Sequence, residues 1–228
     1  PGDDEPHEVF PAAMKLAMRF HMRKLCENPH CVDSLVLYMN SPTKNDGTSL
    51  LWDIDQDGKS EESERYRIEE LLSDLRSCAA RQVHVIVDQS YAGELARAFR
   101  RSREHRNVVV YASGKDGEYS YGNEYTQHWV DYPHTHRCTH HVHEEARIHV
   151  LHSTPEIAEP DGTSRTTIFG APCDVIPPFT EKELRRNYWG CQNLPTAIWF
   201  RQVSSRSSDI GLILDVPRYK SDSSMPYT

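Results

Sequence analysis

The stretch RQVHVIVDQSYAGELARAF, residues 81–99, decides how this chain is expected to fold. Its first half, VHVIVD, is rich in β-branched residues and is typical of a buried strand. The polar segment that follows predicts a tight turn, and the remainder predicts a helix. A strand, turn and helix in this order lift one side chain to the edge of a sheet. Here that side chain is Ser90, between Gln89 and Tyr91.

The neighbouring segments repeat the alternation of strand and helix. Residues 11–25 and 66–80 predict amphipathic helices, while DSLVLYM (33–39) and NVVVYAS (107–113) predict further buried strands. Such alternation predicts an α/β fold with a mainly parallel central sheet and helices on both faces. The apolar face of the first helix is expected to consist of Ala13, Leu16, Ala17, Phe20 and Leu25.

The pattern weakens after about residue 131. Residues 134–152 are rich in histidine and end in an expected strand, 146–152. A helix is expected from Thr180, which has Glu183 in capping-box position, and TAIWFRQV (196–203) is expected to be a strand. We therefore predict one domain over residues 1–203. Residues 204–228 would form a linker followed by a tail or one extra strand.

Composition excludes several classes of partner. The net charge of −8 argues against nucleic acid, which is bound by basic surfaces that neutralise phosphate. No apolar run reaches the roughly 18–20 residues of a membrane-spanning helix, so no span is expected. The first residue is Pro rather than Met. The chain is accordingly expected to be part of a longer precursor, whose other domains or chains are candidate partners.

The cysteine count bears on the cellular compartment. The chain has 6 cysteines, and they occur neither as C-x-x-C nor at zinc-finger spacing. CENPHC, residues 26–31, is expected to close a small disulfide loop, because Asn and Pro favour the turn it needs. Disulfides would indicate an extracellular location or the lumen of the secretory pathway. Reduced thiols in a cytoplasmic regulator are the alternative, which counting the free thiols of the unreduced protein would distinguish.

Taken together, these segments resemble the caspase-like fold of the cysteine peptidase clan that contains legumains, metacaspases and caspases. The resemblance covers roughly residues 11–130. YASGKDGEYSYGNEYTQHWV, residues 111–130, is most similar to the legumain branch. The resemblance implies a catalytic Cys at the end of one core strand and a catalytic His at the end of the preceding one. The thiolate attacks a peptide carbonyl and the imidazole takes the thiol proton.

Neither catalytic residue is present at its expected position. Ser90 takes the place of the Cys in Asp88-Gln89-Ser90-Tyr91-Ala92-Gly93, and Pro42 takes the place of the His after LVLYM. Proline cannot accept a proton, and a serine hydroxyl without a base is a poor nucleophile. We therefore predict a catalytically inactive pseudopeptidase that acts as a protein-binding or structural module.

The predicted binding site is a groove at the carboxyl ends of the strands, where α/β sheets place ligands. Ser90, Ser113 and Tyr121 are its candidate residues, and a protein or peptide is the expected ligand. The alternative is an active hydrolase. In that case Ser90 would be the nucleophile, and His84 or a more distant histidine would be the base.

A second motif, DIDQDGKSEESE at residues 53–64, has the spacing of a calcium loop. Its predicted ligands are the side chains of Asp53, Asp55, Asp57 and Glu64 and the backbone carbonyl of Lys59. Glu61 is a further candidate, bound directly or through a water molecule. Gly58 permits the sharp turn. Ser60 replaces the usual aliphatic residue, and a strand rather than a helix is expected before the loop, so this is not an ordinary EF-hand. The alternative is an acidic loop that only contacts water.

Histidines gather between residues 134 and 152, at His134, His136, His140, His141, His143, His149 and His152. Zinc binds imidazole and thiolate, and Cys138 lies between His136 and His140. No pair has the H-E-x-x-H arrangement, however. The sequence therefore favours surface or pH-sensitive packing roles over a zinc site.

Overall fold

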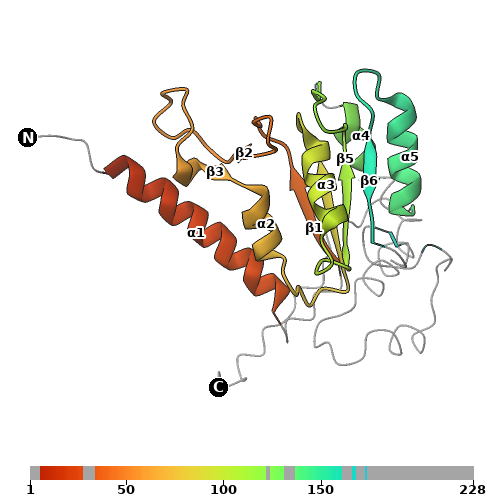
Figure 1. Cartoon of the computed structure of the whole chain (residues 1–228), viewed down its shortest axis with the longest axis horizontal. Coiled ribbons are helices and arrows are strands. Elements are labelled where there is room, and N and C mark those ends of the chain that lie inside the picture. Colours follow the sequence, from red (N-terminus) through yellow and green to blue (C-terminus); the bar gives the residue numbers. More distant parts are fainter. Residues whose placement is uncertain are drawn as a thin grey trace, which may run out of the picture.

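The computed structural model describes residues 6–27, 34–121, 124–130, 137–160, 166–167 and 173, with side chains from residue 11 onward. Figure 1 shows the arrangement of the helices and strands. The helices are α1 (Pro6–Cys26), α2 (Ile68–Asp74), α3 (Ala92–Arg101), α4 (Glu124–Val130) and α5 (Thr139–His149). The strands are β1 (Ser34–Met39), β2 (Ser49–Leu50), β3 (Arg65–Tyr66), β4 (Gln82–Val87), β5 (Val108–Ala112) and β6 (Glu156–Ala158). A short 3-10 helix, η1, spans Glu62–Glu64.

The central sheet has four strands in the order β1-β4-β5-β6. β1 and β5 both run parallel to β4, whereas β6 runs antiparallel to β5. The mixed α/β class and the mostly parallel sheet are therefore confirmed. β2 and β3 form a separate antiparallel ribbon that precedes α2. The second helix, α2, is shorter than the predicted 66–80.

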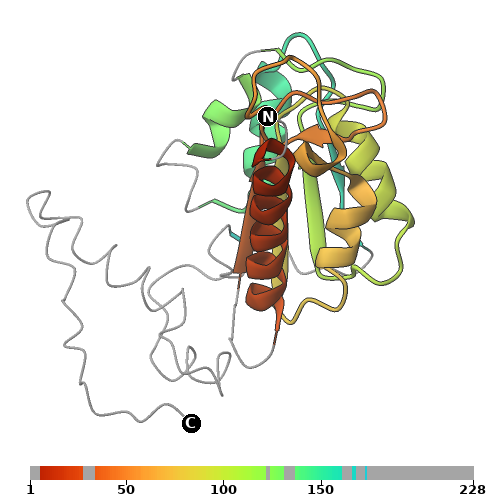
Figure 2. The same ribbon diagram turned by 90° about the vertical axis from the view of Figure 1, so that its left-hand side faces the viewer.

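The two faces of the sheet bury different sets of side chains. On one face, Val83, Val85 and Val87 of β4 share a core with Leu71 of α2 and Leu95 of α3. On the other face, Ile86 and Tyr111 share a core with Tyr125 of α4 and Val142 of α5. Figure 2 shows α2 and α3 on one side of the sheet and α4 and α5 on the other. Both faces are thus covered by helices, as predicted.

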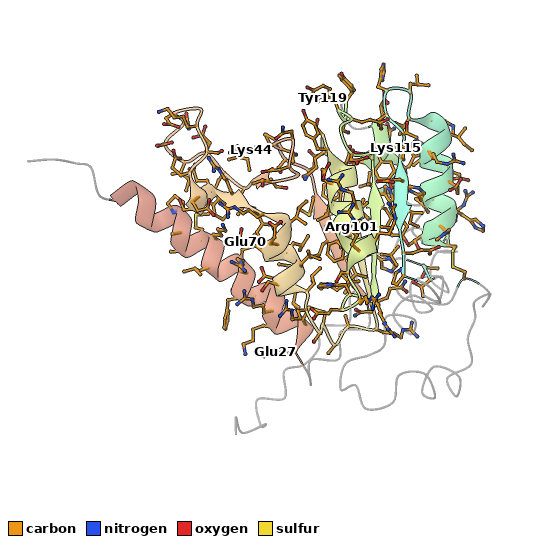
Figure 3. All side chains as sticks on the ribbon, viewed as in Figure 1. Glu27, Lys44, Glu70, Arg101, Lys115 and Tyr119 are labelled. Atoms are coloured by element: carbon orange, nitrogen blue, oxygen red, sulfur yellow. A yellow bond between two sulfur atoms is a disulfide. The ribbon has the colours of Figure 1, made fainter. Side chains whose placement is uncertain are left out.

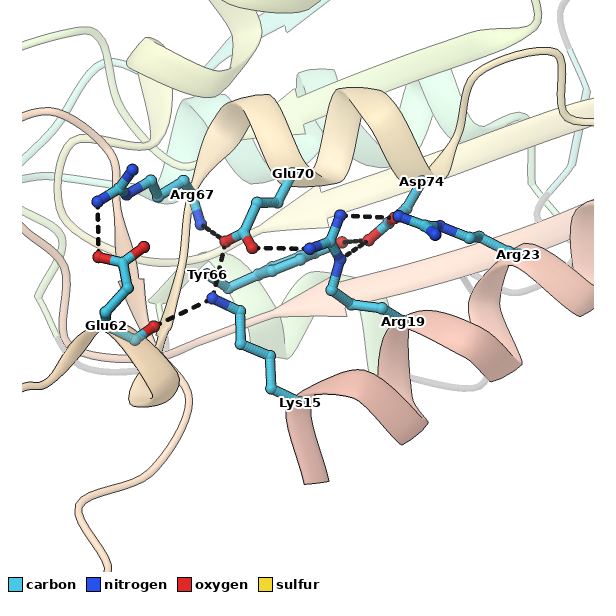
Figure 4. A network of polar contacts seen from close by, with 8 residues as sticks. All are labelled: Lys15, Arg19, Arg23, Glu62, Tyr66, Arg67, Glu70 and Asp74. Atoms are coloured by element: carbon cyan, nitrogen blue, oxygen red, sulfur yellow. Dashed lines mark hydrogen bonds and ion pairs between the residues drawn. The ribbon is translucent and has the colours of Figure 1, made fainter. Parts of the chain in front are cut away.

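The prediction that α1 buries the apolar face named above is wrong. Leu16 is 67% exposed and Phe20 is 55% exposed. Charged side chains face the protein instead, beside the buried Met22 and Cys26. Arg19 donates to Asp74 of α2 through Nε (2.7 Å) and Nη2 (3.0 Å), and through Nη1 to Glu70 (2.8 Å). Asp74 is also bound by Arg23, as Figure 4 shows.

The ends of α1 also differ from expectation. The helix begins at Pro6, so Pro11 lies inside it rather than in its first turn. Lys15 is buried against η1 and α2: its Nζ donates to the carbonyl of Glu62 (3.1 Å) and pairs with Glu70 (3.0 Å). Ion pairs and hydrogen bonds to α2 and η1, together with the buried Met22 and Cys26, therefore determine which side of α1 faces inward.

The expected strand at 146–152 is also wrong. α5 continues to His149, because Val142, Ala146 and Val150 are four residues apart and bury one helical face. The antiparallel strand β6 follows at Glu156–Ala158 instead. The expected helix from Thr180, the strand at 196–203 and the segment 204–228 lie outside the described residues.

Among the described residues, two disulfides join distant segments. Cys26 at the end of α1 pairs with Cys78 after α2, so the expected small loop between Cys26 and Cys31 is wrong. The backbone supports this pairing, because the amide of Ala79 donates to the carbonyl of Cys26 (2.8 Å). Cys138 pairs with Cys173. Disulfides of this kind favour an oxidising compartment. Within the described part of the chain, no helix is long and apolar enough to cross a membrane.

Candidate functional site

Ser90 lies in the turn between β4 and α3. The next residue, Tyr91, has a left-handed backbone (φ 59°), which is uncommon for a residue other than glycine. Gly93 permits the close packing of this turn, since a Cβ atom there would lie 2.1 Å from the amide nitrogen of Asp116. Ser90 is half-buried, and its Oγ accepts a hydrogen bond from the amide of Ser120 (3.2 Å). The tight turn predicted from the sequence is present.

The acid two residues before Ser90 is fully engaged in structural contacts. Asp88 is 3% exposed and accepts hydrogen bonds from the Ser120 hydroxyl (2.7 Å) and from the amide of Thr126 (2.9 Å). The hydroxyl of Thr126 also donates to it. Asp88 thus connects β4 to the loop after β5 and to α4. The hydrogen bonds of this carboxylate go to Ser120 and Thr126 rather than to Ser90, so it is not placed as a base for Ser90.

No histidine is bonded to Ser90 among the described residues. His84 lies in the middle of β4, in register with Val36 of β1 and Val109 of β5. At about 3.3 Å per residue, the four residues from His84 to Asp88 separate it from the turn by about 13 Å. His84 is fully buried, and burial lowers its pKa to about 4. It is therefore a core residue of the sheet.

The loop after β1 contains Pro42 and is attached to the Ser90 turn through Gln89. The side chain of Gln89 donates to Ser49 Oγ (2.9 Å) and accepts from Ser41 Oγ (3.4 Å). The carbonyl of Pro42 accepts from the amide of Leu50 (2.9 Å). Pro42 therefore holds the β2 ribbon in place, and its ring offers no group for proton transfer.

Tyrosines form an exposed ridge beside Ser90. Tyr119 is 56% exposed and Tyr121 is 53% exposed. Tyr119 contacts the ring of Tyr91 (centroids 5.4 Å apart), and Tyr121 contacts the ring of His152 (5.4 Å). We refer to these four residues as the tyrosine ridge. Of them only Tyr121 was predicted as a binding residue. Tyr119, labelled in Figure 3, lies close to it, with ring centroids 6.5 Å apart, and its place two residues before Tyr121 in EYSY is the signal that could have identified it.

Ser113, the third predicted groove residue, is not on this surface. It is 1% exposed and its hydroxyl donates to the carbonyl of Gln89 (3.4 Å). Its own carbonyl accepts from the Ser153 hydroxyl (2.6 Å). Ser113 therefore stabilises the Ser90 turn from the protein interior, and it would affect a binding surface there only indirectly.

In the acidic loop, residues 53–64, backbone amides donate hydrogen bonds to the carboxylates of the same loop. Asp53 accepts from the amide of Gly58 (3.2 Å), Asp55 from that of Asp57 (3.3 Å), and Asp57 from that of Lys59 (2.7 Å). Gly58 has a positive φ of 74°, as its predicted turn requires. These contacts orient the alternating carboxylates inward along one short segment.

Glu64 closes the acidic loop from η1. It is 3% exposed, and its carboxylate accepts from the amides of Ile54 (3.2 Å) and Glu61 (3.1 Å). Oxygens of Asp53, Asp55 and Glu64 lie within 4.8 Å of one another, and so do those of Asp55, Asp57 and Glu61. Asp53 Oδ1 is buried and has no hydrogen-bond partner in the described structure. The loop could therefore hold a metal ion.

Lys59 has a second role in the acidic loop. Its ammonium donates to Asp57 (2.9 Å), and this hydrogen bond lowers the pKa of that carboxyl. Glu61, also a candidate ligand from the sequence, completes the second group of carboxylates. The structure thus places the candidate carboxylates in two overlapping groups that share Asp55.

The histidine cluster is mainly part of α5. His143 is buried and bonded through Nδ1 to the Tyr125 hydroxyl (2.8 Å), and burial lowers its pKa to about 4. Cys138 is held in its disulfide and offers no thiolate. Within the described ranges, no histidine belongs to a group placed to bind a metal. His134 and His136 lie outside those ranges.

A pocket of about 180 Å³ separates the Pro42 loop from the acidic loop. Its lining includes Pro42, Lys44, Asp53, Lys59 and Arg65. Sequence analysis missed this pocket, because its walls come from two segments that are brought together only by the β2–β3 ribbon.

Comparisons with known proteins do not assign a family. The sequence matches no model of a known protein family. A search of curated proteins also gives no match. A functional assignment therefore depends on the Ser90 turn, the acidic loop and the pocket beside it.

Proposed function

We propose that this chain is a catalytically inactive, caspase-like domain, most similar to the legumain branch, that serves as a calcium-stabilised protein-binding module. The observation that carries the proposal is the Ser90 turn. Ser90 has no histidine partner among the described residues, and Asp88 is bound to Ser120 and Thr126. A serine in this setting has no general base to activate it. Pro42, at the position of the family's histidine, supports the same conclusion.

The tyrosine ridge is the proposed contact surface for a protein or peptide partner. Tyrosine is enriched at interfaces, because its ring gives a large apolar contact and its hydroxyl gives a polar one. Tyr119 and Tyr121 offer this combination near the carboxyl ends of the strands of the central sheet, beside Ser90. The ridge therefore supports a binding role at the place where a peptidase would hold its substrate.

Calcium is the proposed ion of the acidic loop. Asp53, Asp55, Asp57 and Glu64 supply the hard carboxylate oxygens that calcium prefers, with the Lys59 carbonyl at the remaining predicted position. The ion would offset the mutual repulsion of these carboxylates and fix η1 against the loop. Two disulfides favour an oxidising compartment, and the proposed setting is extracellular or the secretory lumen, where calcium is abundant.

A thermal melt with and without millimolar calcium tests this proposal. A site with a dissociation constant near 10 µM would add roughly 2.7 kcal/mol at 1 mM calcium, enough to raise the midpoint by several degrees. Glu64→Gln should remove the shift, because Glu64 closes the loop. Glu69→Gln, an exposed acid of α2, is the matched control and should keep it. Equal melts of the wild-type protein in calcium and in chelator would exclude a stabilising calcium site.

A serine hydrolase is the second candidate, favoured by one observation. Tyr91 holds a left-handed backbone directly after Ser90, between a strand and a helix, and such turns present nucleophiles in hydrolases. We expect no labelling of Ser90 by a fluorophosphonate probe. Labelling that disappears in Ser90→Ala but persists in Ser120→Ala would instead establish a reactive serine and refute the inactive assignment.

A further inference from the structure

The pocket beside the acidic loop has a size suited to one side chain. Its volume of about 180 Å³ is below the roughly 300–1,000 Å³ of typical small-molecule sites. One wall is the loop after β1, and the opposite wall is the acidic loop with the residue that follows it, Arg65. A single group entering from a partner would contact both walls at once.

The lining of this pocket is cationic, although the chain as a whole is acidic. Lys44, Lys59 and Arg65 face one acid in the lining, Asp53. Lys59 is paired with Asp57, and Arg65 is held by Ser60 (3.1 Å from Nε to Oγ). Lys44 forms no ion pair within the described part of the chain, although it contributes to lowering the pKa of Asp46. Its ammonium is the pocket's principal unengaged cation.

One hydroxyl group adds a donor to the same lining. Thr48 and Ser49 are both buried and line the pocket, but the Thr48 hydroxyl is already bonded to Asp46. Ser49 Oγ accepts a hydrogen bond from Gln89, so its own hydroxyl hydrogen remains to be donated. Ammonium and hydroxyl donors on one wall are the groups that bind a carboxylate or a phosphate.

We propose that this pocket binds an anionic side chain of a partner peptide, with Lys44 as its main anchor, and that calcium in the acidic loop strengthens this binding. The calcium dependence rests on the proposed function, whereas the anion site stands on the pocket itself. Asp53 provides the link. It lines the pocket and also belongs to the carboxylate group of the loop, so an ion bound there would cancel the pocket's one negative charge. The coupling must be reciprocal, so the peptide would also tighten calcium binding.

Fluorescence anisotropy with labelled synthetic peptides tests the anion site. Three short peptides alternate Gly with Glu, with phosphoserine or with Gln, and each is titrated in calcium and in chelator. The Gln peptide should bind at least about tenfold more weakly than an anionic one, as expected for one lost charge-assisted hydrogen bond. Comparing the Glu and phosphoserine peptides assigns the preferred anion to a carboxylate or a phosphate.

Substitutions separate this proposal from the calcium proposal. Lys44→Ala should weaken the anionic peptide about tenfold while keeping the calcium shift of the melt. Lys24→Ala, an exposed lysine of α1, should leave peptide binding unchanged. Glu64→Gln should retain binding in chelator but lose its enhancement by calcium. Equal binding of the Gln peptide, or no effect of Lys44→Ala, would overturn the anion site even if the calcium shift persists. Peptide affinity insensitive to calcium would overturn the coupling.

Discussion

His84 and His143, two of the buried histidines, influence how the core responds to acid. Burial lowers the pKa of both His84 and His143 from 6.5 to about 4, so the fold favours their neutral form. The unfolded chain therefore takes up protons first as the pH falls. The contribution of the two neutral histidines to the free energy of unfolding is fully present above pH 6.5. It falls between pH 6.5 and pH 4, by about 3 kcal/mol for each histidine.

Urea unfolding at a series of pH values measures this loss. His143→Phe should flatten the dependence, since it removes one of the two titrating groups. His141→Gln, a substitution of an exposed residue on the same helix, should not change it. A free energy of unfolding that is constant from pH 6.5 to pH 4 would show that neither histidine is held neutral in the fold.

The carboxylates of the acidic loop could be grouped from the sequence because their chemistry is local. Asp53, Asp55 and Glu64 lie close together in the structure, as do Asp55, Asp57 and Glu61, because one short loop carries them all. Lys44 was missed as a site residue because it meets the acidic loop only through the pairing of β2 with β3. The spacing of residues along the chain does not reveal such a long-range contact.

At the scale of the element, the ion-pair contact between α1 and α2 depends on Asp74. Its side chain is fully buried and binds Arg19, Arg23 and the Tyr66 hydroxyl (2.9 Å). Asp74→Ala would leave Arg19 with Glu70 alone and would remove the acceptor of the buried Tyr66 hydroxyl, and we expect a loss of about 3 kcal/mol in the free energy of unfolding. Glu27→Ala, which removes an exposed pair with Lys24, should cost less than about 1 kcal/mol. Urea denaturation compares the two, and equal effects would contradict the structural role of Asp74.

The orientation of α1 could have been anticipated from charge rather than from hydrophobicity. Lys15, Arg19 and Arg23 are spaced four residues apart, as are Glu70 and Asp74 on α2. Two such rows are complementary when the helices meet. Apolar periodicity instead selected Leu16 and Phe20, since it identifies an apolar side without showing that anything in the described chain covers it. For α5, histidines among the apolar residues concealed the helical period.

At the scale of the whole molecule, the disulfide between Cys26 and Cys78 connects α1 to the segment after α2 across 52 residues. In the chain-entropy account, closing a loop of this length stabilises the fold by about 4 kcal/mol. The Cys26→Ala/Cys78→Ala double variant should therefore melt at a lower temperature than the oxidised protein. Because the double variant lacks this bond, its melting temperature should not fall further from reduction of the bond when reductant is added. A double variant as stable as wild type would show that the bond makes no net contribution.

The parallel sheet itself was predictable, because three β-rich runs alternate with helices and parallel strands require such crossovers. The cysteine pairing was not predictable in the same way. Cys26 lies five residues from Cys31 in sequence, but the fold brings it to Cys78 (Cα–Cα 4.3 Å). Long-range partners of this kind are set by how the helices pack, and no local turn preference reveals them.

The same disulfide has a consequence for the lifetime of the chain among proteases. Lys59 stands out from the acidic loop with 77% of its side chain exposed, which makes it an accessible cut site for trypsin. A cut there falls between Cys26 and Cys78, so the two pieces would stay covalently joined. β1 would also remain hydrogen-bonded to β4. The molecule would then persist as a nicked, two-chain form that separates into fragments only after reduction.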